Sequence, residues 1–99
     1  MDRLIEFSRR STTQLEKILT FYDERNGSDL YSKRLVKTLL LELQRIAKHP
    51  TIGNPSTRID VRFIYLMGFT IIYRYNSKRI SVLSIRSDSR NPLNAYQKK

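Results

Sequence analysis

The feature that most constrains the fold is a series of β-branched and aromatic runs in the last third of the chain. The runs cover residues 61–67, 69–75 and 80–86, and the breaks between them are Gly68 and the triplet Asn76-Ser77-Lys78. Runs of this kind, divided by short turn-forming breaks, are typical of consecutive antiparallel strands. The sequence therefore predicts a three-stranded sheet that must bury one face against another part of the chain.

Arginines occur along this predicted sheet where an ordinary small domain carries neutral residues. Arg62, Arg74 and Arg86 lie on the three runs, and Arg90 follows in the closing segment Asp88-Ser89-Arg90-Asn91-Pro92. A sheet that carries guanidinium groups on one face is suited to anions, above all phosphates. The strand register decides whether these arginines share a face, and the sequence alone leaves it open.

Alternation along the middle run divides its side chains between the two faces of the sheet. One face has the core-like set Phe69, Ile71, Tyr73 and Tyr75. The other face has the mixed set Thr70, Ile72 and Arg74. The other tyrosines also follow apolar periodicity, so core packing is favoured over base stacking for Tyr22, Tyr31, Tyr65, Tyr73 and Tyr75. Tyr96 is the exception, because it follows Pro92 near the end of the chain.

The first half of the chain has helical periodicity. A capping box over Ser11–Gln14 predicts the start of a first helix, and its apolar stripe is Leu15, Ile18, Leu19 and Tyr22. After the turn Asn26-Gly27-Ser28, with Ser28 or Asp29 as cap, a second stripe comprises Tyr31, Leu35, Leu39, Leu43 and Ile46 and stops before Pro50. Two helices joined by a short turn predict an antiparallel hairpin.

These elements together predict an α+β fold of the order β-α-α-β-β-β. The short apolar run Leu4–Phe7 is the first strand, the helical hairpin follows, and three antiparallel strands form a curved sheet packed on the helices. A chain of 99 residues is long enough for one domain with one core. We therefore expect residues 1–99 to form a single domain.

The charge of the chain is strongly and unevenly basic. Nineteen Lys and Arg against nine Asp and Glu give a formal net charge of +10. Residues 1–50 hold ten bases and seven acids, a net of +3, whereas residues 51–99 hold nine bases and two acids, a net of +7. The positive excess thus falls on the predicted sheet, where it would attract nucleic acid or an acidic protein.

Several classes of site are excluded by composition. The chain has no cysteine, which excludes disulfides, thiolate catalysis and Cys-ligated zinc, and the single His49 cannot build a metal site by itself. We expect no cofactor. No apolar run reaches the roughly 18 residues needed to span a bilayer, and residues 1–7 do not read as a signal peptide, so we expect a cytoplasmic protein that does not contact the membrane.

The order of these elements resembles the RelE/ParE superfamily of toxins from type II toxin–antitoxin systems. The resemblance covers about Leu4 to Pro92, and it is carried by Asn26-Gly27-Ser28, Pro50-Thr51-Ile52-Gly53, Arg62, Ile71-Ile72-Tyr73-Arg74 and the run from Ile80 into Asp88-Ser89-Arg90-Asn91-Pro92. The ending is similar to ParE-like members in particular. The resemblance implies a growth-inhibiting toxin of the plasmid-stabilization kind, neutralised by a cognate antitoxin within a toxin–antitoxin hetero-oligomer.

Two mechanisms are implied by this resemblance. RelE-like members are metal-independent endoribonucleases, or mRNA interferases, that cleave messenger RNA in the ribosome, whereas ParE-like members poison DNA gyrase by binding. RelE-like nucleases carry an arginine directly after the Gly-Tyr that opens the aromatic strand, and Thr70 stands at the matching position after Gly68-Phe69. The preceding strand also lacks their lysines, and Tyr96 is displaced from the place of their tyrosine.

The ParE-like interpretation is therefore preferred, with the RelE-like nuclease as its alternative. On this interpretation Arg62, Arg74, Arg86, Arg90 and Tyr96 form a target-facing basic surface, and the catalytic residues of any nuclease activity are unknown. Arg62 and Arg74 have an equally simple structural use as ion-pair partners of Asp60 or Asp88. A third hypothesis is a basic module that binds nucleic acid without enzymatic or toxic activity.

Overall fold

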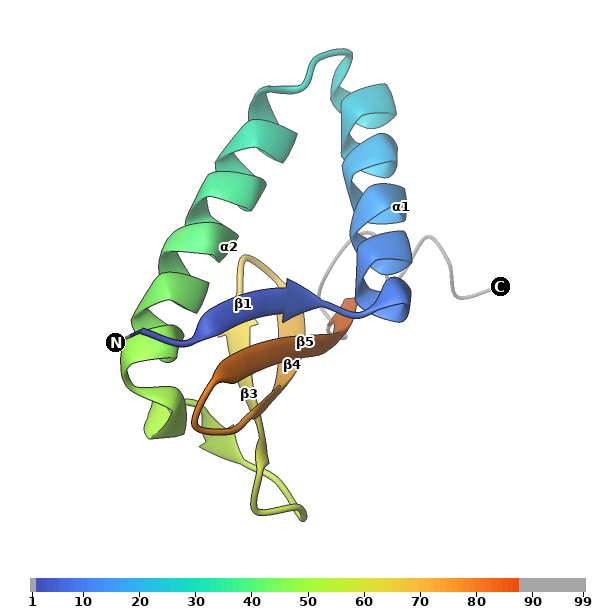
Figure 1. Ribbon diagram of the computed structural model, residues 1–99. Helices are drawn as coiled ribbons and strands as arrows, with labels where there is room; N and C mark the ends of the chain where they lie inside the picture. The colour runs from blue at the N-terminus through green and yellow to red at the C-terminus, as the bar shows by residue number, and fades with distance from the viewer. Residues whose placement is uncertain (1, 88–99) are drawn as a thin grey trace.

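The computed structural model describes residues 2–87, in which one strand and two helices precede the remaining strands (Figure 1). The elements are β1 Leu4–Phe7, α1 Arg9–Asn26, α2 Leu30–Lys48, the 3-10 turn η1 Pro50–Ile52, β2 Asn54–Pro55, β3 Val61–Leu66, β4 Phe69–Tyr75 and β5 Arg79–Ser87. The predicted α+β class and element order are confirmed. The two-residue strand β2 is an addition that no sequence pattern indicated.

The strands form one mixed sheet with the order β1-β5-β4-β3-β2. The pairs β2–β3, β3–β4 and β4–β5 are antiparallel, as consecutive strands joined by short connections must be. β1 instead runs parallel to β5, with Leu4 opposite Arg79 and Phe7 opposite Val82. The helical hairpin between them provides the crossover that a parallel pair requires.

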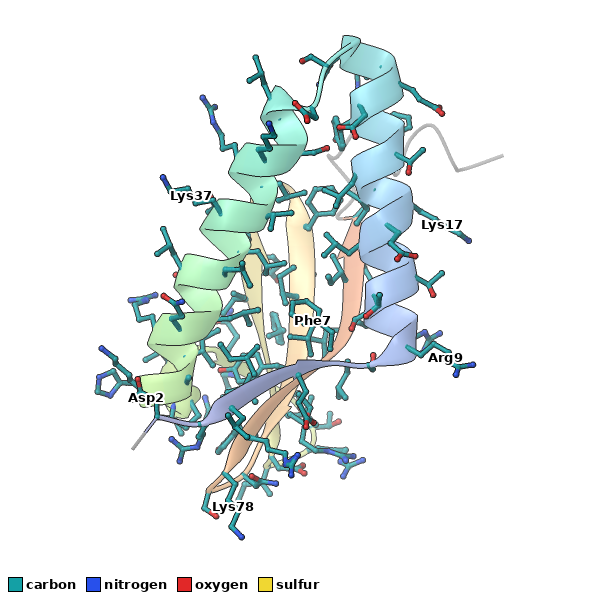
Figure 2. All side chains as sticks on the ribbon, turned by 45° about the horizontal axis from the view of Figure 1, so that its top comes forward. Asp2, Phe7, Arg9, Lys17, Lys37 and Lys78 are labelled. Carbon is teal, nitrogen blue, oxygen red and sulfur yellow. The ribbon has the colours of Figure 1, made fainter. Side chains whose placement is uncertain are left out.

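Both helices pack on the same face of the sheet. The buried core joins Ile18 and Tyr22 of α1 and the α2 stripe to the sheet residues Phe69, Ile71, Tyr73, Ile80, Val82 and Ile85. Phe7 points into this core between the helices and the sheet, whereas Lys17 and Lys37 extend outward from the two helices (Figure 2). The predicted core face of β4 is confirmed.

The N-cap of helix α1 is three residues earlier than predicted, so the capping box at Ser11 is wrong. Ser8 is the N-cap, and its hydroxyl oxygen accepts a hydrogen bond from the Ser11 N–H at 3.0 Å. Ser11 is fully buried, and its hydroxyl lies 3.0 Å from the Val82 carbonyl of β5. Gln14 accepts the Ile85 N–H at 2.7 Å through its side-chain oxygen. Packing on β5 therefore uses the two polar residues that the local pattern assigned to a cap.

The hairpin turns follow local backbone chemistry more closely. Gly27 ends α1 in the left-handed region, with φ of 67°. Asp29 precedes α2 as predicted, although its side chain makes no capping hydrogen bond and lies 3.5 Å from Lys33 instead. The β3–β4 turn is the pair Met67-Gly68, with φ of 51° and 86°. Positive φ at both positions matches the two-residue turn that suits the twist of a hairpin.

Candidate functional site

Arg62, one of the predicted target-facing residues, lies on the helix-facing side of the sheet. It is paired across the strands with the buried Tyr73, and paired residues point to the same face. One guanidinium nitrogen donates to the Gly53 carbonyl at 2.8 Å, and the Nε is buried without a hydrogen-bond partner. Arg62 therefore secures the connection from α2 into the sheet, and it does not pair with Asp60 as considered above.

Tyr73 holds the same connection from beneath. Its hydroxyl donates to the Pro50 carbonyl at 2.6 Å and accepts the Gly53 N–H at 3.1 Å. A Cβ at position 53 would lie 2.4 Å from the tyrosine oxygen, so only glycine allows this approach. Burial raises the pKa of Tyr73, although the Gly53 hydrogen bond and the nearby Arg62 oppose the shift. The tyrosine is thus a neutral structural residue.

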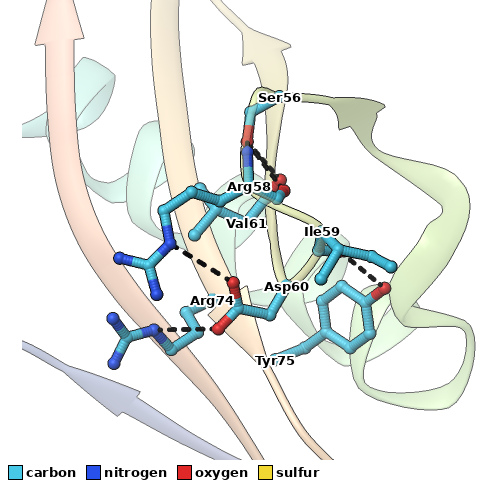
Figure 3. A network of polar contacts seen from close by, with 7 residues as sticks. All are labelled: Ser56, Arg58, Ile59, Asp60, Val61, Arg74 and Tyr75. Carbon is cyan, nitrogen blue, oxygen red and sulfur yellow. Dashed lines mark hydrogen bonds and ion pairs between the residues drawn. The ribbon is translucent and has the colours of Figure 1, made fainter.

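Arg74 lies on the opposite face and belongs to a polar cluster at one end of the sheet (Figure 3). Its Nε is 3.4 Å from one oxygen of Asp60, and the Nε of Arg58 is 3.5 Å from the other. The pairing with Asp60 that was considered for Arg74 is therefore present. Both guanidinium groups remain substantially exposed. Because two arginines share one carboxylate, the cluster has a net charge of +1.

Arg86 shares the face of Arg74 but lies toward the other end of the sheet. It is opposite Thr70, whereas Arg74 is four residues further along β4, which corresponds to roughly 13 Å of extended strand. The Arg86 Nε donates to the Ser84 hydroxyl at 3.3 Å, and Ser84 in turn contacts Gln14 of α1. This network fixes the base of the side chain and leaves the residue exposed.

The structure does not gather the three described arginines into one site. Arg62 faces the helices, while Arg74 and Arg86 occupy separate ends of the other face. Arg90, Tyr96 and Asp88 lie outside the described residues. Arg62 therefore does not share a basic surface with Arg74 and Arg86. A role of Arg74, Arg86 and Arg90 in target contact stays a prediction.

Tyr65 departs from the expected core position. The other tyrosines considered above are buried or half-buried, as predicted, but Tyr65 is 66% exposed. It lies opposite Thr70, which places it on the face of Arg74 and Arg86, and its ring packs edge-on against Phe63 at 5.6 Å. Its β-strand alternation with Phe63 was visible in the sequence, but the face that this pair occupies depended on the register.

An apolar groove lies along the helical hairpin, away from the arginines. It has a volume of about 610 Å³ and is lined by Leu19 of α1 and by Val36, Leu40 and Leu41 of α2. The charged residues along it are Asp23, Asp29, Lys33 and Lys37. Leu40 and Leu41 are exposed. The signal for this groove was the sequence Leu39-Leu40-Leu41, because three consecutive helical positions cannot all face one core.

Residues 2–87 hold neither a metal-binding cluster nor a membrane-spanning helix. No group of three or more His, Cys, Asp and Glu side chains is placed to hold a metal ion there. Neither described helix combines the length and the apolar character needed to cross a membrane.

Comparison with known proteins gives one family match and several structural neighbours. The profile of the family described as the ParE toxin of type II toxin–antitoxin system, parDE, matches residues 5–92. The fold is similar to a chain of the chromosomal ParDE system of P. aeruginosa, with 24% identity, a TM-score of 0.69 and coverage of 86% of this chain and 95% of that one. A chain of the E. coli DinJ-YafQ toxin–antitoxin complex gives 14% identity, a TM-score of 0.52 and full coverage of both chains. No curated protein matches.

Proposed function

Because this chain belongs to the ParE toxin family of type II toxin–antitoxin systems, and is the toxin component of such a system, we propose that it arrests growth by binding DNA gyrase. The observation that carries the choice of target is the neighbourhood of Arg86. Its cross-strand partner is Thr70, which stands where nuclease-type members of the superfamily carry an arginine. A threonine brings no positive charge to a reacting phosphate.

The exposed sheet face supports binding better than catalysis. Metal-free cleavage of RNA needs a base for the nucleophile, an acid for the leaving oxygen and cationic stabilisation of the transition state. Around Thr70 the described residues offer Tyr65 and Arg86. Loss of one electrostatic donor typically lowers a rate by about two to three orders of magnitude, so this set is poor for a nuclease.

A cognate antitoxin is the second partner of this protein. The structural neighbours include complexes of a toxin with its antitoxin, and the helical groove is a concave surface whose exposed lining is mainly apolar. An amphipathic antitoxin segment could bury its apolar side chains on Leu40 and Leu41 and place carboxylates near Lys33 and Lys37. A location in the cytoplasm, where gyrase works, belongs to the same proposal.

The decisive experiment compares the two targets under one induction. The protein is expressed with and without its antitoxin, and DNA supercoiling and transcript integrity are scored in the same cells. We expect loss of supercoiling and gyrase trapped on DNA, with transcripts intact. Cleavage of messenger RNA at the A site of added ribosomes, with normal supercoiling, would overturn the gyrase proposal in favour of the nuclease.

The proposed role of the arginines in target contact is tested by removing Arg86, which lies on the exposed sheet face, together with Arg90 of the C-terminal segment. The double variant Arg86→Ala with Arg90→Ala should relieve growth arrest, because rim charges govern the encounter with a partner. It should leave antitoxin binding within about twofold, because the antitoxin is assigned to the helical groove. The double variant Arg9→Ala with Lys17→Ala is the matched control, since it also removes two positive charges, both from exposed positions of α1. Full toxicity of the variant that lacks Arg86 and Arg90 would contradict the assignment of this face to the target.

A further inference from the structure

The loop between β2 and β3 ends in a tightly bonded turn that presents one apolar side chain (Figure 3). The turn covers residues 58–61 and is closed by a hydrogen bond from the Val61 N–H to the Arg58 carbonyl at 3.2 Å. The Ser56 hydroxyl lies 2.7 Å from the Val61 carbonyl, to which it donates, and it accepts the Arg58 N–H at 3.1 Å. The backbone of the turn is thus held from within.

The neighbouring strand β4 holds the turn from outside. The Tyr75 N–H donates to the Asp60 carbonyl at 3.0 Å, and the Tyr75 hydroxyl donates to the Ile59 carbonyl at 3.3 Å. The ion pairs of Asp60 with Arg58 and Arg74 tie the side chains of the turn to the same strand. Because its backbone and its carboxylate are both anchored, the turn presents the residue at position 59 in a fixed place.

That residue is isoleucine, and its side chain has no structural use in the described protein. Ile59 is 91% exposed, more than any other large hydrophobic residue of residues 2–87. Central positions of turns favour Gly, Pro, Asn, Asp and Ser, whereas a β-branched apolar side chain suits a buried strand. Residues that violate such local preferences without a gain in packing are expected at functional positions. A fixed and exposed aliphatic side chain has the character of an interface anchor.

The charges around Ile59 indicate the kind of surface that it fits. Arg58 and Arg74 share the single carboxylate of Asp60, so the rim of the turn carries an excess positive charge. A complementary surface has an apolar pocket with carboxylates at its edge. A second copy of this chain, with a net charge of +10, is repelled, and so is its own C-terminal segment, which holds three bases and one acid in residues 88–99. Nucleic acid offers phosphates, but it accepts an aliphatic side chain only as a wedge that unstacks a base step and kinks the duplex.

We propose that Ile59 is the anchor by which this toxin docks onto its target protein, inserting into an apolar pocket that is rimmed by acidic residues contacting Arg58 and Arg74. This inference rests on the proposed function, because the target protein is taken to be DNA gyrase. The turn lies at the sheet end of the molecule, and the groove assigned to the antitoxin lies along the helices. The two partners therefore use different surfaces.

The test measures the affinity of the purified protein for purified DNA gyrase and, separately, for its antitoxin. Ile59→Ser removes the anchor, and Leu30→Ser is the matched control, because Leu30 is also largely exposed but begins helix α2. We expect Ile59→Ser to weaken gyrase binding at least tenfold and to leave antitoxin binding within about twofold. Leu30→Ser should bind gyrase like the wild type. Circular dichroism and the urea midpoint confirm that both variants remain folded.

The possible failures are distinguishable. If the wild type binds gyrase and Ile59→Ser binds equally well, this inference is wrong and the proposed function stands. If Ile59→Ser loses gyrase and antitoxin in the same proportion, or Leu30→Ser loses gyrase as strongly, the anchor is not specific and the inference is also wrong. If the wild type itself does not bind gyrase, the proposed function fails and this inference fails with it.

Discussion

The contact between Tyr73 and Gly53 gives the sharpest prediction about stability. The tyrosine hydroxyl makes two hydrogen bonds to the segment that leads from α2 into the sheet, at 2.6 Å to the Pro50 carbonyl and 3.1 Å from the Gly53 N–H. The change Tyr73→Phe removes both bonds and keeps the ring in a site that is fully buried. It therefore isolates the polar contribution of this tyrosine from its packing.

The size of the effect follows from what is left behind. Each hydrogen bond contributes about 1 kcal/mol net, and the Gly53 N–H loses its partner in a buried place, which costs about 1–3 kcal/mol. We expect Tyr73→Phe to lower the free energy of unfolding by about 2–3 kcal/mol. For a domain of this length that loss lowers Tm by roughly 8–24 °C.

The second change, Gly53→Ala, tests the same contact from the other side. A Cβ would lie 2.4 Å from the tyrosine oxygen and 2.9 Å from the ring carbon Cε1, so the ring must move and the same hydrogen bonds are lost. In the Phe background the oxygen is absent and those bonds are already gone. The double variant should therefore lose less than the sum of the single losses, with a coupling of roughly 1–2 kcal/mol.

Urea denaturation of the four purified proteins, followed by circular dichroism, measures this cycle. Tyr75→Phe is the control on the same strand, because its hydroxyl makes one longer bond of 3.3 Å at an exposed site, and its loss should cost about 0.5 kcal/mol or less. A Tyr73→Phe variant within about 0.5 kcal/mol of the wild type would refute the reasoning. So would a double variant whose loss equals the sum of the single losses.

The remaining predictions concern pH and the start of α1. Burial raises the pKa of Tyr73 above its ordinary value of 10.0, so the unfolded chain releases this proton first; stability should hold below about pH 10 and decline at higher pH. Denaturation midpoints between about pH 8 and 11 measure the decline, which should be smaller in Tyr73→Phe but not abolished, since burial also raises the pKa of Tyr31. Ser8→Ala removes the N-cap of α1 and should lower the free energy of unfolding by about 1 kcal/mol, measured by thermal denaturation. If Ser11 and Gln14 capped the helix instead, the stability of Ser8→Ala would equal that of the wild type.

Much of the fold was predictable because its signals are local. Turn residues such as Gly27 and Gly68 mark where the backbone needs positive φ, and the helical stripes and strand alternation identify the buried residues from a few neighbouring positions. These signals were enough for the α+β class, the element order and the core face of β4. The resemblance to the RelE/ParE superfamily, carried by the order of the motifs, is confirmed by the family match.

The site was less predictable because it depends on register. The two-residue turn Met67-Gly68 places Arg62 opposite Tyr73, and a shift of one residue would place it opposite Arg74 on the other face. Long-range contacts also decided the start of helix α1. Ser11 and Gln14 suit a capping box, but they bond to β5, which lies about 70 residues away in the chain.

The sequence by itself determined the main helices and strands and the basic charge, because periodicity, turn residues and composition act over short stretches of chain. The family was accessible at the same level through the resemblance of its motifs. Only the tertiary structure decided which side chains meet, since that depends on strand pairing and helix packing between distant segments. It assigned Arg62 and Tyr73 to holding the α2–sheet connection, and it left Arg74, Arg86 and Ile59 exposed.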